Sequence, residues 1–173
     1  SDIGGTNKGA VFIYFGQNGE TPFDTNPQII TGKNRFDQVA SVVACDVNGD
    51  DHIDLILGSP YADDDGVSDD NGKNIGAINI HYGGLNGFRS EPDLQRFGRR
   101  LDVQQQWATT YALELGEHLA VGDLNDDGYC DVIAATAKQG PIGTLQDTSD
   151  ESGMIAIFLG SELGPSQRPS KII

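Results

Sequence analysis

The sequence is poor in basic residues and has no long apolar run. Only 11 Lys and Arg stand against 26 Asp and Glu, which gives a formal net charge of -15 and a pI near 4.2. A surface of this charge repels nucleic acid and anionic membranes and suits cations or basic partners. No window approaches the roughly 20 apolar residues of a membrane-spanning helix, and no basic and apolar leader precedes Ser1. We therefore expect no nucleic-acid partner and no membrane insertion.

Residue patterns typical of catalysis are also missing. The three histidines, His52, His81 and His118, show no partner spacing, which argues against a zinc site or a catalytic dyad. The sequence has no Gly-x-Ser-x-Gly motif, phosphate-binding loop or dinucleotide-binding glycine motif. We therefore expect a chain that is not an enzyme. Its start at Ser1 instead of Met suggests a processed or excised piece of a longer protein, although trimming for production gives the same start.

Cysteine is limited to Cys45 and Cys130. Two cysteines form a disulfide only if their Cβ atoms come within about 4.5 Å, which a sequence does not reveal. Free cysteine is among the most buried residue types, so two buried, unpaired strand residues are the favoured interpretation. A disulfide across adjacent units remains the alternative.

Glycine, by contrast, is abundant at 23 of 173 residues, a balance that favours strands and turns. A β-rich apolar run that ends in glycine occurs three times, as GAVFIYFG, GAINIHYG and GMIAIFLG at residues 9–16, 76–83 and 153–160. These runs define an internal repeat. The sequence therefore predicts an all-β fold built from a few similar units.

Each complete unit contains four short apolar runs. In the first unit we expect strands at Val39–Cys45, Ile53–Leu57, Ala77–Tyr82 and Leu94–Phe97, and in the second at Leu119–Gly122, Val132–Thr136, Met154–Leu159 and Lys171–Ile173. The run at 9–16 and Gln28–Thr31 are the third and fourth strands of an earlier unit. Repeated four-stranded antiparallel units are typical of β-propeller blades. We expect about two and a half blades: a half blade at 1–35 and blades at 36–100 and 101–173, with apolar faces exposed at both ends.

Two acidic loops occupy the same place in the two complete units. They are Asp46–Asp54 and Asp123–Asp131, and both carry side-chain oxygens at positions 1, 3, 5 and 9. Calcium binds six to eight oxygens in flexible geometry, whereas zinc prefers Cys and His. We expect one calcium ion in each loop, bound by side chains and by the backbone carbonyls of position 7. The candidate ligands are Asp46, Asn48, Asp50, His52 and Asp54 in the first loop, and Asp123, Asn125, Asp127, Tyr129 and Asp131 in the second.

Simple turns and EF-hands fit these two loops less well than a calcium site in a β-hairpin. Asp, Asn and Gly do make simple turns, but turns do not require several mutually repelling carboxylates, nor an acid at position 9. An EF-hand requires an acid at position 12 and flanking helices, whereas position 12 is Leu57 or Ala134 and the flanking runs are short and apolar. Asp51 replaces the glycine of position 6 in the first loop, and Asp tolerates the turn conformation at modest cost.

The order of motifs resembles the FG-GAP repeat of integrin alpha-subunit propellers and of many secreted bacterial proteins. The resemblance covers essentially the whole chain: a DxNxDGxxD loop, an apolar strand, a Gly-Ala-Pro-like turn at Gly58-Ser59-Pro60 and a GxVxVxxG strand. The second unit departs from the pattern, with Ala135-Thr136-Ala137 at the turn and Leu115-Gly116 for Phe-Gly. The resemblance implies a seven-bladed propeller with structural calcium on the face opposite the usual ligand-binding face.

Three functional hypotheses follow. The first is a calcium-binding, non-catalytic propeller segment of an extracellular or cell-surface protein, used for adhesion or recognition of a protein or glycan. The second is an accessory part of a larger secreted hydrolase or phospholipase-type enzyme. The third is a subunit that self-assembles into an extracellular oligomer or filament. The expected partners include the remaining blades or another copy of the chain.

Overall fold

The computed structural model describes residues 7–18, 22–34, 37–63, 74–98, 100–101, 107–108, 114–137 and 153–173. In these ranges the regular elements are all β-strands, which confirms the all-β prediction, and no helix there has the length and apolar character to cross a membrane. The strands are β1 (Ala10–Ile13), β2 (Gln28–Thr31), β3 (Ser41–Cys45), β4 (Asp54–Ser59), β5 (Ala77–His81), β6 (Leu94–Phe97), β7 (Arg100–Leu101), β8 (Trp107–Ala108), β9 (His118–Gly122), β10 (Asp131–Thr136), β11 (Met154–Phe158) and β12 (Lys171–Ile172).

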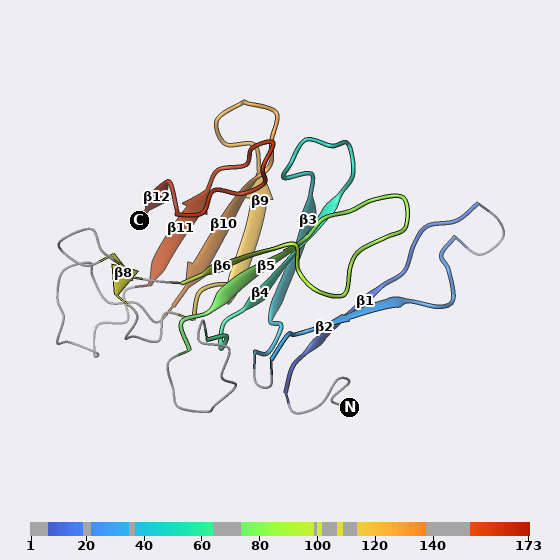
Figure 1. Cartoon of the computed structure of the whole chain (residues 1–173), viewed down its shortest axis with the longest axis horizontal. Coiled ribbons are helices and arrows are strands. Elements are labelled where there is room, and N and C mark those ends of the chain that lie inside the picture. Colours follow the sequence, from blue (N-terminus) through green and yellow to red (C-terminus); the bar gives the residue numbers. More distant parts are fainter. Residues whose placement is uncertain are drawn as a thin grey trace.

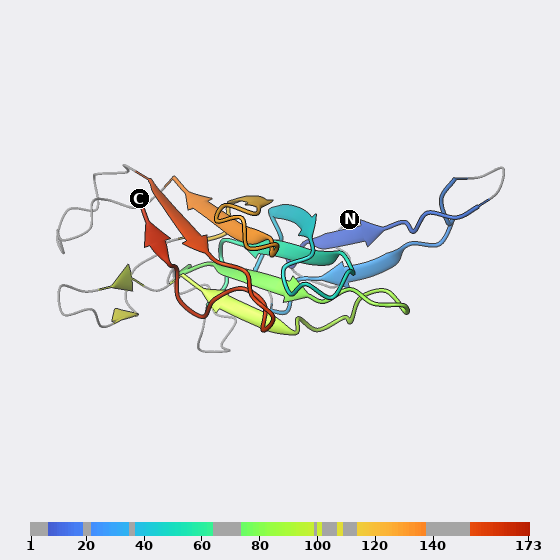
Figure 2. The ribbon, with the colours of Figure 1, turned by 90° about the horizontal axis from the view of Figure 1, so that it is seen from above.

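The strands form two four-stranded antiparallel sheets and two strand pairs. One sheet has the order β3-β4-β5-β6 and the other has the order β9-β10-β11-β12, while β1 pairs with β2 and β7 pairs with β8. The sheets lie in chain order along the molecule, from the blue β1–β2 pair to the orange and red sheet (Figure 1, Figure 2). The predicted strands are therefore confirmed, and their boundaries differ from the observed ones by at most two residues. The exception is the first strand, which was expected over residues 9–16 and spans Ala10–Ile13. The predicted division into 1–35, 36–100 and 101–173 stays a prediction, because its boundaries adjoin residues outside the described ranges.

The two central strands of the middle sheet, β4 and β5, are buried on both faces, whereas the outer strand β3 leaves Val42 and Ala44 exposed. Every residue of β4 and β5 is buried, so neither strand shows the alternation of a half-exposed sheet. Ile56 points into the cluster shared with the β9–β12 sheet, whereas its neighbours Leu55 and Leu57 pack with Ile30 of β2. Each fully buried side chain of this size contributes about 1.5–3 kcal/mol. The main core therefore lies between the two four-stranded sheets, with a smaller core toward the first pair.

A glycine contact allows the two four-stranded sheets to approach closely. Gly58 of β4 lies against the carbonyl of Gly116, where an added Cβ would overlap backbone atoms. Ser41 Oγ donates to the same carbonyl at 2.7 Å. Gly58 and Gly116 belong to the Gly-Ala-Pro-like and Phe-Gly-like motifs of consecutive units. These repeat glycines therefore serve blade-to-blade packing.

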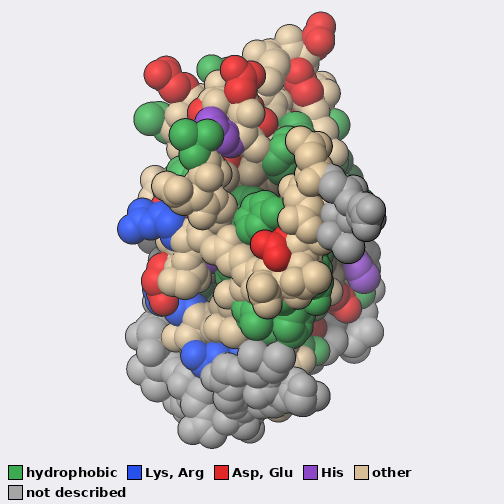
Figure 3. All heavy atoms as spheres, turned by 90° about the vertical axis from the view of Figure 1, so that its right-hand side faces the viewer, with side chains coloured by type: hydrophobic (Ala, Val, Ile, Leu, Met, Phe, Trp, Pro, Cys, Tyr) green, Lys and Arg blue, Asp and Glu red, His purple; other side chains and the backbone are tan. Residues whose placement is uncertain are grey.

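Apolar side chains reach the surface at both ends of the described structure, as predicted for an incomplete propeller. Figure 3 views the end that carries the β1–β2 pair, where apolar side chains lie exposed among polar ones. Phe12 and Ile29 are cross-strand partners there and are 44% and 42% exposed. At the other end Ile155 and Ile173 are 40% and 69% exposed. Surfaces of this kind are suited to contact with another apolar surface.

Cys45 and Cys130 form a disulfide across the two sheets, with a Cα–Cα distance of 6.1 Å and a separation of 85 positions in the chain. The favoured interpretation of two unpaired thiols was therefore wrong. The pairing arises because β3 and β9 are packed side by side, so that the end of β3 meets the loop before β10. Local sequence carries no signal of that contact.

Candidate cation-binding loops

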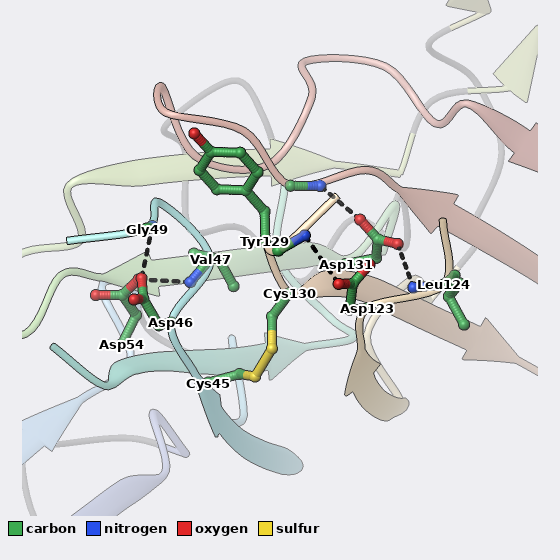
Figure 4. Close-up of a disulfide and its surroundings, with 12 residues drawn as sticks. Cys45, Asp46, Val47, Gly49, Asp54, Asp123, Leu124, Tyr129, Cys130 and Asp131 are labelled. Carbon is green, nitrogen blue, oxygen red and sulfur yellow. Dashed lines mark hydrogen bonds between the residues drawn. A yellow bond between two sulfur atoms is a disulfide. The ribbon is translucent and has the colours of Figure 1, made fainter. Parts of the chain in front are cut away.

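The two acidic loops are the turns between the first and second strands of the two four-stranded sheets. Asp46–Asp54 connects β3 to β4, and Asp123–Asp131 connects β9 to β10. Both loops lie at the same end of their sheets, on either side of the disulfide (Figure 4). The structure therefore brings the two predicted sites together as neighbours.

In the first loop, the position-1 carboxylate holds the turn closed. Asp46 accepts hydrogen bonds from the backbone N–H groups of Asp50 at 3.2 Å and Asp51 at 2.9 Å. Asp50 in turn accepts from the side-chain amide of Asn48 at 3.1 Å and from the backbone N–H of His52 at 2.9 Å. The five residues thus form one local network in which the carboxylates face the loop's own backbone.

The second loop repeats this network residue for residue. Asp123 accepts from the backbone N–H groups of Asp127 at 3.1 Å and Gly128 at 2.9 Å. Asp127 accepts from the side-chain amide of Asn125 at 2.8 Å and from the backbone N–H of Tyr129 at 3.0 Å. Two loops with different residues at positions 2, 4, 6, 7 and 8 therefore adopt the same conformation through the shared oxygens.

The position-9 acid of the first loop is buried and anchors the loop to the sheet. Asp54 has no exposed surface, and its two oxygens accept from the backbone N–H groups of Val47 and Gly83, each at 2.9 Å. Burial raises the pKa of Asp54, and the charges of Asp50 and Asp46 add to the rise, while the two N–H groups oppose it. The loop carboxylates are therefore close enough for mutual repulsion, which a bound cation would relieve.

Asp131 occupies the equivalent place in the second sheet. It is fully buried and accepts from Leu124 at 2.9 Å and from Gly160 at 2.8 Å. Sequence reasoning missed the role of the two glycines, although a signal was present. Gly83 and Gly160 close the repeated apolar strands, and each follows its position-9 acid by 29 residues.

The turn conformations agree with the expectation for position 6. Asp51 has a φ of 64° where Gly128 has a φ of 90°, so Asp adopts the left-handed conformation there. Position 4 is also left-handed, with φ 74° at Gly49 and 58° at Asp126.

The exposed acids of the loops are held in the charged form by hydrogen bonds from the backbone. The N–H of His52 lowers the pKa of Asp50, and the N–H of Gly128 lowers the pKa of Asp123.

The donor set of each loop fits calcium by chemistry. The side-chain donors are carboxylate and amide oxygens, and a carboxylate has about four lone-pair sites, so a hydrogen bond to N–H leaves room for a cation. In the described part of the chain, no three His, Cys, Asp or Glu side chains are grouped in an arrangement that holds a metal ion.

Comparison with known proteins shows three integrin alpha subunits as relatives. Integrin alpha-PS2 of Drosophila melanogaster is 31% identical over 144 residues, 77% of this chain and 8% of that protein. Integrin alpha-V of Gallus gallus is 26% identical over 166 residues, 95% of this chain and 14% of that protein. Integrin alpha-IIb of Mus musculus is 32% identical over 136 residues, 77% of this chain and 11% of that protein.

No family model matches the chain. The chain spans between 8% and 14% of the length of these three relatives. The similarity nevertheless covers most of this chain and agrees with its four-stranded antiparallel sheets. The chain is therefore a relative of integrin alpha subunits, with blades of an FG-GAP-like β-propeller.

Proposed function

We propose that the chain is a calcium-stabilised, non-catalytic β-propeller segment of an extracellular or cell-surface protein that serves adhesion or molecular recognition. The observation that carries the proposal is the repeated hydrogen-bond network of the two loops in adjacent blades. Similarity to integrin alpha subunits supports the extracellular and adhesive part of the proposal. That similarity also supports a role without catalysis.

The calcium ligands would be the oxygens that the loop pattern provides. In the first loop these are the side chains of Asp46, Asn48, Asp50 and Asp54 with the carbonyl of His52. The second loop would use the equivalent atoms of Asp123, Asn125, Asp127, Tyr129 and Asp131. Calcium would supply two positive charges among clustered carboxylates, which lowers their repulsion and links ion binding to folding stability.

The ions would have a structural role. Each loop lies at one end of its blade, and its position-9 acid binds the end of the third strand through Gly83 or Gly160. An ion there stiffens the hairpin without forming a substrate site. Recognition of a protein or glycan ligand would then use other surfaces of the complete propeller.

A self-assembling subunit is a second candidate, favoured by the exposed apolar side chains at both ends of the described structure. The ends of a partial propeller would be covered by the remaining blades or by another copy of the chain. Measurement of the mass in solution distinguishes self-assembly of this chain from a segment that requires the remaining blades. A stable monomer of 18.4 kDa would contradict self-assembly.

Thermal unfolding with calcium and with EGTA tests the calcium proposal. An ion that binds the folded state alone stabilises it by about 2.7 kcal/mol at 100 times its Kd, so chelation should lower the Tm and added calcium should restore it. The variant Asp50→Asn with Asp127→Asn should lose this response, whereas Asp126→Asn, a change of charge at a position outside the ligand set, should retain it. A Tm that is the same in EGTA and in calcium would refute the proposal.

A further inference from the structure

The two loops contact each other directly through their backbones. The N–H of Cys130, at position 8 of the second loop, donates to the carbonyl of Asp46, at position 1 of the first, at 3.0 Å. Just beyond β11, the N–H of Ser161 donates to the carbonyl of Val47 at 3.4 Å. The first loop therefore rests on the second blade.

The ring of Tyr129 packs on the first loop at Gly49 (Figure 4). A Cβ built on Gly49 would lie 2.6 Å from Cε1 of Tyr129, so a larger residue at this position would displace the ring from its present place. Tyr129 is also the residue whose carbonyl is the expected position-7 ligand of the second loop. One residue thus belongs to the ligand set of one loop and to the packing of the other.

The contact is one-directional. His52 holds the equivalent position 7 of the first loop, and its ring nitrogen Nδ1 lies 3.0 Å from the carbonyl of Asp50 in its own loop. The structure therefore provides an internal control: two equivalent side chains, of which Tyr129 reaches across to the neighbouring loop.

The disulfide fastens this contact at its base. Cys45 directly precedes Asp46, the first residue of one loop, and Cys130 directly precedes Asp131, the last residue of the other. A covalent bond between residues adjacent to ligands of both loops limits how far one loop can move without the other.

We propose that the two loops are one coupled cation-binding unit, in which occupancy of either loop raises the calcium affinity of the other through Tyr129 and the Cys45–Cys130 disulfide. The inference rests on the proposed calcium function. Calcium in the second loop would restrict the motion of the Tyr129 backbone. The position of the Tyr129 ring on Gly49 and the hydrogen bond from Cys130 to Asp46 would then also be more restricted. The first loop then has less ordering to complete when it binds its own ion.

Repulsion between the two ions opposes this coupling, but the opposition is small. Each loop carries carboxylates at positions 1, 5 and 9, so each ion is neutralised by its own loop. Salt screens the remainder of the interaction. Coupling between sites in proteins is typically about 5-fold to 150-fold, and we expect a value near 5-fold here.

The test is a calcium titration of the full 173-residue chain with its disulfide intact, followed by NMR. The backbone amide signals of Gly49 and Gly128 report the two loops separately in one sample. Asp127→Asn, which disables the second loop, should raise the calcium midpoint of Gly49 about 5-fold. Because coupling is reciprocal, Asp50→Asn should raise the midpoint of Gly128 by the same factor.

The positioning role of Tyr129 is tested with its matched residue. Tyr129→Ala keeps every oxygen ligand of the second loop and should raise the midpoint of Gly49, while His52→Ala should leave the midpoint of Gly128 unchanged. A purely structural role of the tyrosine could also move the first loop's midpoint, because the ring packs on Gly49. The deciding readout is therefore the double variant: if coupling runs through Tyr129, adding Asp127→Asn to Tyr129→Ala should give little further shift at Gly49, whereas a full further shift of about 5-fold would overturn the role of Tyr129. Cys45→Ser with Cys130→Ser should reduce the reciprocal shifts; if this variant does not fold, the other variants decide the question.

The outcomes separate the two proposals. If neither amide responds to calcium in the wild-type chain, the proposed calcium function fails and the coupling fails with it. If both amides respond but each midpoint is independent of the other loop and of Tyr129, only the coupling is overturned.

Discussion

Asp54 and Asp131 are equivalent residues in consecutive blades, and each fully buried carboxylate joins three segments of chain. One oxygen accepts from the N–H seven residues earlier, and the other accepts from a glycine N–H 29 residues later. The loop between the first two strands is thereby fixed to the end of the third strand. The position-9 acid is therefore a structural anchor of the blade whether or not an ion is bound.

Replacement of this anchor should destabilise the fold strongly. Asp131→Asn preserves shape but has one acceptor oxygen, so either Leu124 or Gly160 would face an amide donor in place of an acceptor. Hydrogen bonds to charged groups contribute about 1.5–3 kcal/mol, and an unpaired buried donor costs about 1–3 kcal/mol. We expect a loss of about 2–4 kcal/mol in urea unfolding in the presence of EGTA. Asp126→Asn, an exposed acid of the same loop, is the control and should change stability by less than about 0.5 kcal/mol; equal losses would contradict the anchor role.

Arg96 should be a second point of attachment between the blades. Its Nε donates to the carbonyls of Pro165 at 3.1 Å and Ser166 at 2.9 Å, beyond β11 in the neighbouring blade. Arg96→Lys removes the planar fork that binds both carbonyls, and we expect a loss of about 1–3 kcal/mol by urea unfolding. Arg89→Lys alters an exposed ion pair with Asp93 and should cost at most about 0.5 kcal/mol. If the two variants are equally stable, the contact of Arg96 does not contribute.

The disulfide should be a large term in the stability of the chain. A bridge that closes a loop of 85 residues stabilises by about 4.5 kcal/mol in the chain-entropy model, because it restricts the unfolded state. Chemical reduction of the wild-type chain should therefore shift its urea midpoint strongly. The double variant Cys45→Ser with Cys130→Ser should unfold at the same urea midpoint as the chemically reduced wild-type chain. Its midpoint should not change when a reductant is added. An unchanged wild-type midpoint after complete reduction would show that the bridge adds nothing.

His81 should make stability depend on pH. The side chain is buried and its Nδ1 lies 2.9 Å from the carbonyl of Arg89, so Nδ1 carries the hydrogen. Burial lowers the pKa of His81 below 6.5, while the Arg89 bond and the charges of Asp93 and Glu91 oppose the shift. The unfolded chain therefore takes up a proton first, so this stability is present above pH 6.5 and is lost as the pH falls through the folded pKa.

Urea unfolding between about pH 5 and pH 8 measures this dependence. His81→Asn keeps a donor near the Arg89 carbonyl and should flatten the pH profile of the unfolding free energy. His118→Asn replaces an exposed histidine and should leave the profile as in the wild type. An equal effect of both variants would exclude burial of His81 as the cause.

Much of the fold follows from short-range patterns in this sequence. The apolar runs predicted Gln28–Thr31 and Leu94–Phe97 with their observed bounds, since period and turn residues act locally. The first strand was placed less well: its run ends at Gly16, but β1 ends at Ile13. Pairing continues irregularly beyond β1, since the N–H of Asp24 donates to the carbonyl of Phe15 at 2.8 Å and Gly16 forms an isolated antiparallel bridge with Phe23. The regular ladder of β1 with β2 nevertheless stops at Ile13, and an apolar run does not show where a ladder becomes irregular.

By itself, the sequence determined the two loops. The oxygens at positions 1, 3, 5 and 9 organise each turn through bonds to nearby backbone and to the closing glycine, so the local conformation of each loop follows from its own pattern. Tertiary structure alone decided that Cys45 pairs with Cys130 and that Tyr129 lies on Gly49. Both contacts depend on how one blade packs against the next, and that packing is set by apolar surfaces that have no fixed spacing in the chain.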